Sequence, residues 1–346
     1  MILYSKSAPA ARNRPCEGLL ASCLPKRCKL CYNSTAMLAR LIYNPTAGPW
    51  DVRRALKRVR SELGKRGWSV DLHLTEKPGD ATRLAREAAE MGYDVAVAVG
   101  GDGTVNEVVN GLVGSETALG VLPVGTGNLW ARQMGIPVYA LTNPLRLHET
   151  AAMVAGGTIR QIDVGQVNGR YFLCWAGIGL DAQVTSELEP RQRYTKHLGV
   201  LPYAIAVVLV ARDFQGVRTR VYLDGAVVRG RTLLILASNI QQYGGQLHVA
   251  SNARIDDGLL DVFVFKGLGF PYVLRHVVKM ASRRCLQDPQ IVHRQARHIE
   301  VFTEWAIPVQ VDGDPIGTTP VTIQVVPRAL RVLVPPSAPT GLFVSG

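Results

Sequence analysis

The sequence of 346 residues lacks any long apolar run. A membrane-spanning helix needs about eighteen or more apolar residues in a row, whereas the longest apolar stretch, residues 199–211, contains Pro202 and is followed by Arg212. Two standard phosphate-binding patterns, Gly-x-x-x-x-Gly-Lys-Ser/Thr and Gly-x-Gly-x-x-Gly, are also absent. No internal repeat or low-complexity segment occurs. These absences exclude a protein integral to the membrane, a P-loop nucleotidase and a repeat protein. The spacing in 199–211 suits a helix with a wide apolar face, for core packing or for lipid contact.

Cysteine is scarce in the main part of the sequence. Four of the six cysteines lie within the first 36 residues, and only two lie beyond them. Tight ligand spacing is confined to Cys28 and Cys31, so a zinc site there is a minor alternative. Basic residues interrupt this segment and leave no continuous apolar core for a signal peptide. We therefore expect residues 1–36 to be a disordered extension, with Met37 as the true start. The other two cysteines, Cys174 and Cys285, are far apart, which is typical of a reduced, cytoplasmic protein.

The chain carries a formal net charge of +12. Six basic residues against one Glu in the first 35 residues account for five of these charges, and the rest belong to the folded body. Such an excess favours an anionic membrane surface or nucleic acid, although solvated surface residues explain it equally well. Because basic residues do not alternate with aromatic ones, we expect no nucleic-acid partner.

Two glycine-rich turns carry the clearest chemical signal. Residues 100–104 read Gly-Gly-Asp-Gly-Thr and stand between a short β-branched strand, 94–99, and an amphipathic helix, 104–113. Residues 123–128, Pro-Val-Gly-Thr-Gly-Asn, follow the next apolar strand in the same way. Glycines let backbone N–H groups approach a ligand, and a helix N-terminus favours phosphate. One such turn is as well explained by turn chemistry, with Asp102 as a helix cap, but two at neighbouring strand ends favour a nucleotide site.

Together with Asn-Pro-Thr-Ala-Gly at residues 44–48, these turns resemble the diacylglycerol kinase catalytic-domain family. The likeness covers roughly residues 38–335 and is most specific over residues 100–112. The family includes bacterial diacylglycerol kinases and eukaryotic sphingosine kinases. The resemblance implies ATP and Mg²⁺ as cofactors, a lipid acceptor, and an active site in a cleft between two domains.

The pattern of elements fits such a chain. Strands near 38–43, 69–74, 94–99 and 118–122 alternate with helical patterns near 50–66, 79–91, 104–113 and 142–155, which predicts a parallel α/β domain over residues 37–157. Short alternating runs, including 171–175, 217–223, 232–237 and 260–265, predict an antiparallel β-sandwich over 158–328. By resemblance to the family, residues 329–346 return to the first domain, with 330–334 as the return strand.

The first loop and Thr126 are assigned to the triphosphate, and resemblance adds two more residues to the nucleotide site. The full set is Asn44, Thr75, Gly101, Asp102, Gly103, Thr104, Val105, Asn106, Glu107 and Thr126. Relatives often carry a Lys after Asn-Pro-x-x-Gly, whereas this chain has Pro49 and Trp50. Phosphate charge must therefore be offset elsewhere, by Lys57, Arg132 or a metal.

Three acidic segments in the second half complete the expected chemistry. Residues 254–261 hold three carboxylates around a turn glycine, which offers oxygen ligands to a divalent cation or is simply a turn. Resemblance implies Mg²⁺ bound by Asp257 with the carbonyls of Arg254 and Leu259, with Asp256 and Asp261 joining through water. It also implies a general base at Asp314, where relatives have a Glu, and an acceptor contact at Asp181. Asp102 is the alternative base.

We therefore predict an ATP-dependent lipid kinase that acts on a lipid such as diacylglycerol while peripherally associated with a membrane. Two alternatives stay open. A soluble-substrate kinase related to NAD kinases shares the Gly-Gly-Asp-Gly loop, and a non-catalytic lipid-binding homologue is favoured by the Glu-to-Asp change and the missing Lys. The sequence does not identify the acceptor lipid, and a homodimer stays open.

Overall fold

The structure is a computed structural model, which describes residues 36–48, 51–139, 146–188, 210–244 and 247–344. The four N-terminal cysteines and most of the apolar stretch 199–211 lie outside these residues. Among the described residues, no helix has both the length and the apolar character needed to cross a membrane.

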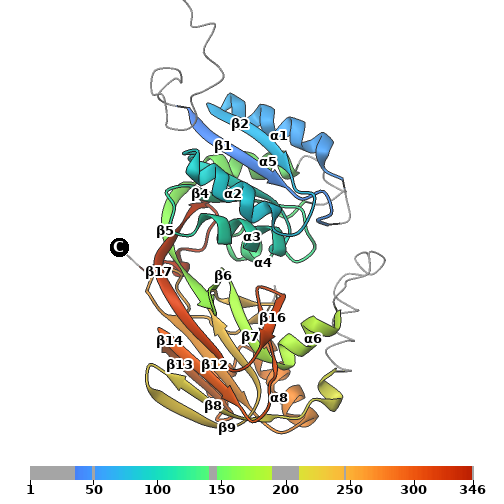
Figure 1. Cartoon of the computed structure of the whole chain (residues 1–346), viewed down its shortest axis with the longest axis vertical. Helices are drawn as coiled ribbons and strands as arrows, with labels where there is room; N and C mark the ends of the chain where they lie inside the picture. The colour runs from blue at the N-terminus through green and yellow to red at the C-terminus, as the bar shows by residue number, and fades with distance from the viewer. Residues whose placement is uncertain (1–35, 49–50, 140–145, 189–209, 245–246, 345–346) are drawn as a thin grey trace, which may run out of the picture.

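A parallel sheet forms the centre of the first domain (Figure 1). Its strands, in the spatial order β2-β1-β3-β4, are β1 Met37–Tyr43, β2 Trp68–Leu74, β3 Val95–Gly100 and β4 Ala118–Pro123. Strand β3 is buried at every position, as a parallel strand covered on both faces must be. All four strands point the same way, so the loops that follow them lie along one edge of the sheet.

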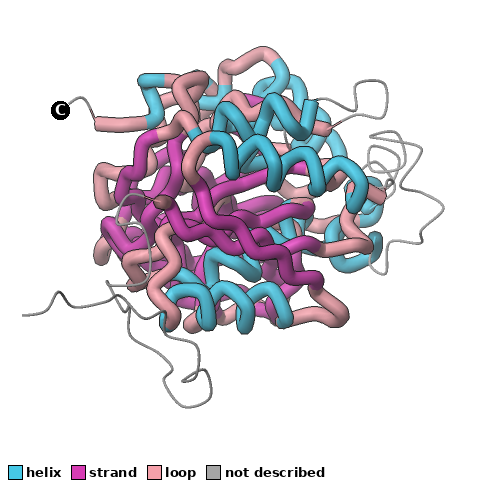
Figure 2. The backbone as a smooth tube through the Cα atoms, turned by 90° about the horizontal axis from the view of Figure 1, so that it is seen from above, coloured by secondary structure: helices cyan, strands magenta, loops and turns pink. Residues whose placement is uncertain are grey.

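Helices cover both faces of this sheet, as Figure 2 shows from above. They are α1 Arg53–Lys65, α2 Asp80–Glu90, α3 Asp102–Leu112, α4 Leu129–Gln133 and α5 Arg146–Ala155. Helices α1 and α5 share one apolar cluster with the sheet, and α2 and α3 share another. Helices α2 and α3 approach closely at Gly111, where a methyl group would lie 2.7 Å from Cβ of Ala85.

The second domain is an antiparallel β-sandwich with few helices. Apolar and exposed positions alternate along its strands, with Val217, Val221 and Leu223 in the core and Arg218 and Arg220 outside. Its elements are β5 Thr158–Val167, β6 Arg170–Phe172, β7 Trp175–Gly179, α6 Leu180–Leu188, β8 Val217–Leu223, β9 Ala226–Ser238, β10 Gln242–Tyr243, β11 Leu247–His248, β12 Leu260–Lys266, α8 Phe270–Ala281, β13 Ile291–Ala296, β14 His298–Thr303, β15 Pro308–Val311, β16 Asp314–Thr318 and β17 Val321–Val334, with 3₁₀ turns η2 Cys285–Gln287 and η3 Thr340–Leu342.

Strands β5 and β17 run through both domains. Strand β17 pairs with β14 of the sandwich and, at Val332, in parallel with Leu119 of β4. Its pairing with β5 shifts between Val326 and Leu330, and Arg328 within that irregularity has a φ of 49°. The end of β17 therefore joins the first sheet, and the fold class predicted from the sequence is confirmed. The predicted domain boundaries fall just before β5 and at this irregularity in β17.

One predicted strand is wrong. Residues 171–175 were expected to form one run, but the structure divides them between β6, which ends at Phe172, and β7, which begins at Trp175. The carboxylate of Asp312 accepts hydrogen bonds from the backbone N–H groups of Leu173, Cys174 and Trp175. Those donors point at a side chain instead of a neighbouring strand, so the ladder is interrupted there.

Candidate active site

The loops that follow β1, β3 and β4 pack against each other at the carboxyl edge of the parallel sheet. A methyl group on Gly48, whose φ is +69°, would overlap the carbonyl oxygen of Val124. One on Gly125 would lie 2.5 Å from Cα of Gly101. Side chains at these positions would push the loops apart, which gives the glycines predicted from the sequence a physical reason.

Side-chain hydrogen bonds fix these loops further. Asn44 donates to Thr104 Oγ1 at 3.1 Å and accepts from the backbone N–H of Thr46 at 2.9 Å. In the loop after β4, Asn128 has a φ of 53° and donates to the carbonyl of Gly125 at 2.6 Å. These hydrogen bonds fix the conformation of both glycine loops, and fixed geometry lowers the ordering cost of binding a ligand.

The N-terminus of α3 supplies free donors to this edge. Among the described residues, the N–H groups of Gly103 and Thr104 have no acceptor, because the first bond of the helix runs from Val105 N–H to the carbonyl of Gly101. Gly103 is also exposed. Unpaired N–H groups and the helix dipole together favour an anion such as a phosphate group.

Asp102 joins the two glycine loops. Its Oδ1 accepts from the backbone N–H of Leu129, the first residue of α4, at 2.6 Å. A methyl group on Gly127 would lie 2.5 Å from its Oδ2. Asp102 is the first residue of α3, and no side chain caps that helix. The carboxylate therefore holds the second loop beside the first, and it stands next to the phosphate-seeking amides.

Asn106 and Arg170 connect α3 to the sandwich. Asn106 is buried, and its amide donates to Asp312 Oδ2 at 3.0 Å and to the carbonyl of Tyr171 at 3.2 Å. Arg170, at the start of β6, donates to Asn106 Oδ1 at 3.1 Å and to Asp314 Oδ2 at 2.7 Å. Asn110 adds a reciprocal pair of bonds with the backbone of Tyr171. The helix that begins at the glycine loop is therefore fastened to the second domain.

This network brings Asp314 to the glycine loop. A methyl group built on Gly103 would lie 3.9 Å from Asp314 Oδ1. The carboxylate is one-third exposed, with Arg170 as its ion-pair partner. Two residues that the sequence separates by more than two hundred positions thus meet at the N-terminus of α3. The glycine loop had predicted Gly103 and the resemblance had predicted Asp314, and the structure brings the two together.

The sequence did not indicate Arg170, whose guanidinium lies beside Asp314. It proposed Lys57, Arg132 or a metal to offset the phosphate charge; Lys57 is exposed on α1, and Arg132 donates to the carbonyl of Gly127. Arg170 lies in an Asn-Gly-Arg hairpin turn that carries no motif. Asp312 was also missed as a structural residue. It is buried, and desolvation raises its pKa while three backbone N–H groups and Asn106 oppose that rise.

Other predicted nucleotide residues take different positions. Val105 is buried in the core. Glu107 turns toward α2, where its carboxylate accepts from the N–H of Ala81 at 3.1 Å. Thr126 is exposed on the second loop, and Thr75 follows β2, with its N–H bonded to the carbonyl of Tyr43. The structure therefore brings Asn44, Gly101, Asp102, Gly103, Thr104 and Asn106 together, while the side chains of Val105 and Glu107 point elsewhere.

Asp181, the predicted acceptor residue, is buried at the start of α6. Burial raises its pKa, and hydrogen bonds from Tyr243 and Gln310 oppose the rise. The amide oxygen of the same Gln310 side chain accepts a hydrogen bond from the N–H of Gly313 at 2.7 Å. Asp181 is therefore linked through one glutamine to the turn that carries Asp314.

The predicted metal segment forms a turn in which acidic groups gather. Asp257 Oδ1 accepts from the N–H of Leu259 at 3.0 Å. Burial raises the pKa of Asp257, and the negative charges of Asp261, Asp163 and Asp256 add to the rise. Asp163, which sequence reasoning missed, also accepts from the N–H of Gly258 at 2.6 Å. A cation would relieve this repulsion, so the residues fit the predicted Mg²⁺.

The outer ligands expected for that ion are engaged elsewhere. Asp256 accepts from the N–H of Val344, and Asp261 is buried against His293 at 2.6 Å. Within the described residues, no group of three or more His, Cys, Asp or Glu side chains is arranged to hold a metal. A site made of one carboxylate and two backbone carbonyls is a different arrangement, and it stays a prediction.

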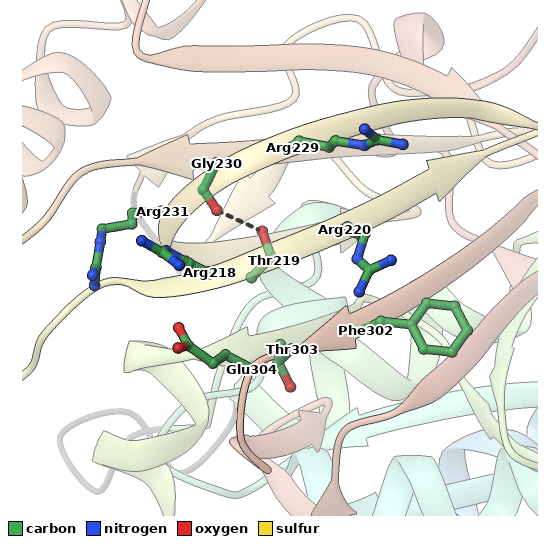
Figure 3. Close-up of a pocket in the computed structure, with 9 residues that line it drawn as sticks. All are labelled: Arg218, Thr219, Arg220, Arg229, Gly230, Arg231, Phe302, Thr303 and Glu304. Atoms are coloured by element: carbon green, nitrogen blue, oxygen red, sulfur yellow. Dashed lines mark hydrogen bonds between the residues drawn. The ribbon is translucent and has the colours of Figure 1, made fainter.

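A separate hollow of about 590 Å³ lies on the outer face of the sandwich (Figure 3). Strands β8, β9 and β14 form it. Arg218 stands opposite Arg231 and Arg220 opposite Arg229, so like charges face each other across the strands. None of the residues of the glycine loops lines it. We call this feature the arginine hollow.

The fold and the candidate site together indicate a class of protein. A parallel α/β domain presents two glycine loops, and a β-sandwich brings a carboxylate to them, which is the architecture of a two-domain kinase. The diacylglycerol kinase catalytic domain matches residues 38–167, and the YegS C-terminal NAD kinase beta sandwich-like domain matches residues 175–334. The chain therefore belongs to the diacylglycerol kinase family.

Individual relatives agree with this assignment. A diacylglycerol kinase of Bacillus subtilis is 32% identical over 300 residues, covering 86% of this chain and 96% of its own length. One of Staphylococcus aureus is 31% identical and covers 86% and 92%. Among solved structures, a candidate diacylglycerol kinase of Bacillus anthracis superposes with a TM-score of 0.73 at 26% identity, over 89% of this chain and all of that one.

Proposed function

We propose that this protein is an ATP-dependent lipid kinase that phosphorylates a hydroxyl group of a membrane lipid such as diacylglycerol. The observation that carries the proposal is the position of Asp314, one-third exposed and held by Arg170 beside the free N–H groups of α3. Phosphoryl transfer needs a bound γ-phosphate, offset negative charge and an acceptor for the proton of the attacking alcohol. Each need has a candidate at this edge of the sheet.

In the proposed reaction the alcohol oxygen attacks the γ-phosphorus, and the bond to the β,γ-bridging oxygen breaks. Gly103 and Thr104 donate N–H groups to the phosphate, and Arg170 offsets its charge. Asp314 accepts the proton of the alcohol, and ADP leaves. Asp257 and the carbonyls of Arg254 and Leu259 would hold Mg²⁺, which would supply positive charge to the site when bound. We propose that the enzyme works as a peripheral protein at the cytoplasmic face of a membrane.

Transfer of label from [γ-³²P]ATP with Mg²⁺ to a panel of micellar lipids tests this function. We expect label in a product that extracts into organic solvent, and we expect Asp102→Asn to lose it, because that change replaces the carboxylate that joins the two glycine loops and is the alternative proton acceptor. Phosphorylation of a water-soluble acceptor alone would assign the soluble-kinase alternative. Retained nucleotide binding without transfer to any acceptor would assign the non-catalytic alternative.

A further inference from the structure

Helix α8 carries an apolar stripe that the rest of the described protein leaves uncovered. Phe270, Leu274, Val277 and Val278 follow the i, i+4, i+7, i+8 spacing of one helical face and are 37%, 56%, 40% and 56% exposed. The adjoining face packs on the sandwich through Val273, His276 and Met280. The apolar arc of α8 is thus wider than the surface it packs against. We call the four exposed residues the α8 stripe.

Further exposed apolar residues occur in the same segment of the sequence. Leu268, Tyr272 and Leu286 are also exposed, so seven of the fourteen exposed large apolar side chains of the described residues lie between positions 268 and 286. Exposed apolar residues scattered singly need no explanation, whereas such a concentration marks an interaction site.

The charge of the same segment is of one sign. Residues 268–287 contain four basic residues and no acidic one. Arg275 forms a two-bond ion pair with Asp288, at 2.7 Å for each bond. For Lys279, Arg283 and Arg284, no side-chain hydrogen bond or ion pair is present within the described part of the chain. Arg283 and Arg284 follow the C-terminal end of α8, so two uncompensated positive charges lie at that end of the stripe, whereas Lys279 is about 150° around the helix from it.

Helix α8 lies on the side of the sandwich that carries the predicted acceptor residue. Val273 of α8 packs in one apolar cluster with Leu180 and Val184 of α6, and α6 begins beside Asp181. Figure 1 shows α6 and α8 on the same side of the second domain. Helix α8 is therefore packed against the helix that carries the predicted acceptor residue.

We propose that the α8 stripe docks the enzyme on an anionic membrane surface, with the apolar side chains in the interface and the basic ones among the lipid head groups. A helix with an apolar face and basic residues at one end has the amphipathic character of an interfacial helix. A second copy of the chain fits less well, because a symmetric contact through α8 would bring the same positive charges together. The proposal rests on the proposed function, since it explains how a soluble fold reaches a lipid.

Co-sedimentation with vesicles tests the docking without measuring activity. The full chain is mixed with vesicles of phosphatidylcholine, with or without phosphatidylglycerol. We expect binding that depends on phosphatidylglycerol. Combined Leu274→Gln and Val278→Gln should weaken it at least tenfold, because both side chains leave the apolar interface. Changing Arg283 and Arg284 to Gln should weaken binding to the anionic vesicles by about fivefold for each charge, whereas Lys279→Gln, on the far side of α8 from the stripe, should have less effect.

The arginine hollow provides the matched control. Val227 and Phe302 lie on strands of that face and are 42% and 45% exposed. Combined Val227→Gln and Phe302→Gln removes similar exposed apolar surface and should leave vesicle binding unchanged. If this control loses binding while the α8 variant keeps it, the arginine hollow is the docking surface and the proposal is wrong.

Two further outcomes would also overturn it. A change from dimer to monomer in the α8 variant, measured by light scattering, would assign the stripe to a second copy. A large drop in its thermal midpoint would assign the stripe to packing within the chain. Activity is read separately with a short-chain, water-soluble acceptor, which we expect the α8 variant to phosphorylate normally. Vesicle binding without transfer to any acceptor would refute the proposed function and leave the docking intact.

Discussion

Three carboxylates near the glycine loops are held in three different ways. Asp312 is buried and receives four hydrogen bonds, which suits a structural role. Asp102 receives the N–H of Leu129 and joins the two loops. Asp314 is one-third exposed and paired with Arg170, so it combines access for a substrate with a fixed orientation. These environments make Asp314 our first candidate for the proton acceptor.

Changing Asp314 to Asn should lower kcat by about 10²- to 10⁴-fold, because an amide cannot accept the proton of the alcohol. Asp314→Glu keeps the carboxylate and restores the length found in relatives. Since Arg170 is also partly exposed, it can follow the longer side chain, and we expect activity within about tenfold of the unmodified protein. Steady-state kinetics, with circular dichroism to verify folding, measures both. Equal activity of the Asn variant and the unmodified protein would exclude Asp314 as the base.

Among single residues, those that belong to a motif of consecutive residues could be predicted from the sequence. The glycines of residues 100–104 and 123–128 predict closely packed loops, because a close approach of two backbones leaves no room for a side chain. Arg170 could not be predicted, because it meets Asp314 across 144 positions and no local pattern marks it. The orientation of the Glu107 side chain toward α2 could not be predicted either, because its partner, the N–H of Ala81, lies on another helix.

Among the elements, α8 is fixed from one side by an ion pair. The guanidinium of Arg275 lowers the pKa of Asp288 to about 2, from an ordinary value of about 3.9. Because the folded-state pKa is the lower one, the stabilisation is complete above about pH 4 and is lost as the pH falls toward about 2.

We therefore expect Asp288→Asn to lower the free energy of unfolding at pH 7 by about 1–2 kcal/mol, after allowing for solvent screening at the partly exposed Arg275. The difference from the unmodified protein should shrink steadily below pH 4. Glu116→Gln is the control, since it removes a pair between Arg331 and a carboxylate that is 85% exposed and should cost less than about 1 kcal/mol. Denaturant unfolding at a series of pH values measures both. A difference for Asp288→Asn that stays constant down to pH 2.5 contradicts the assigned pair.

Most strands and the helices of the first domain could be predicted, because hydrophobic periodicity is a local property, whereas helices α6 and α8 of the second domain were not expected. Strand β8 occupies residues 217–223 as expected, and β3 and α3 differ from expectation by one or two residues at their ends. The error at 171–175 has a non-local cause, since the carboxylate that interrupts the strand is Asp312. A partner far along the chain overrides the local pattern there.

At the scale of the whole molecule, the two domains share strands as well as a site. Resemblance predicted the return of residues 330–334 to the first domain. It did not predict that β17 would run unbroken from the sandwich to β4, because a single strand in two domains leaves no boundary signal in composition. The shared strands and the contacts of Asn106 tie the orientation of Asp314 to the fold of both domains.

This continuity predicts cooperative unfolding. Loss of the sandwich would strip β5 and β17 of partners, and β4 would lose its neighbour at Val332. We expect one calorimetric transition whose van't Hoff and calorimetric enthalpies agree to a ratio of about 1. A nucleotide that binds the first domain should raise the midpoint of that whole transition. Two separated peaks, with nucleotide shifting one of them, would mean that the domains unfold independently and that the shared strands do not couple them.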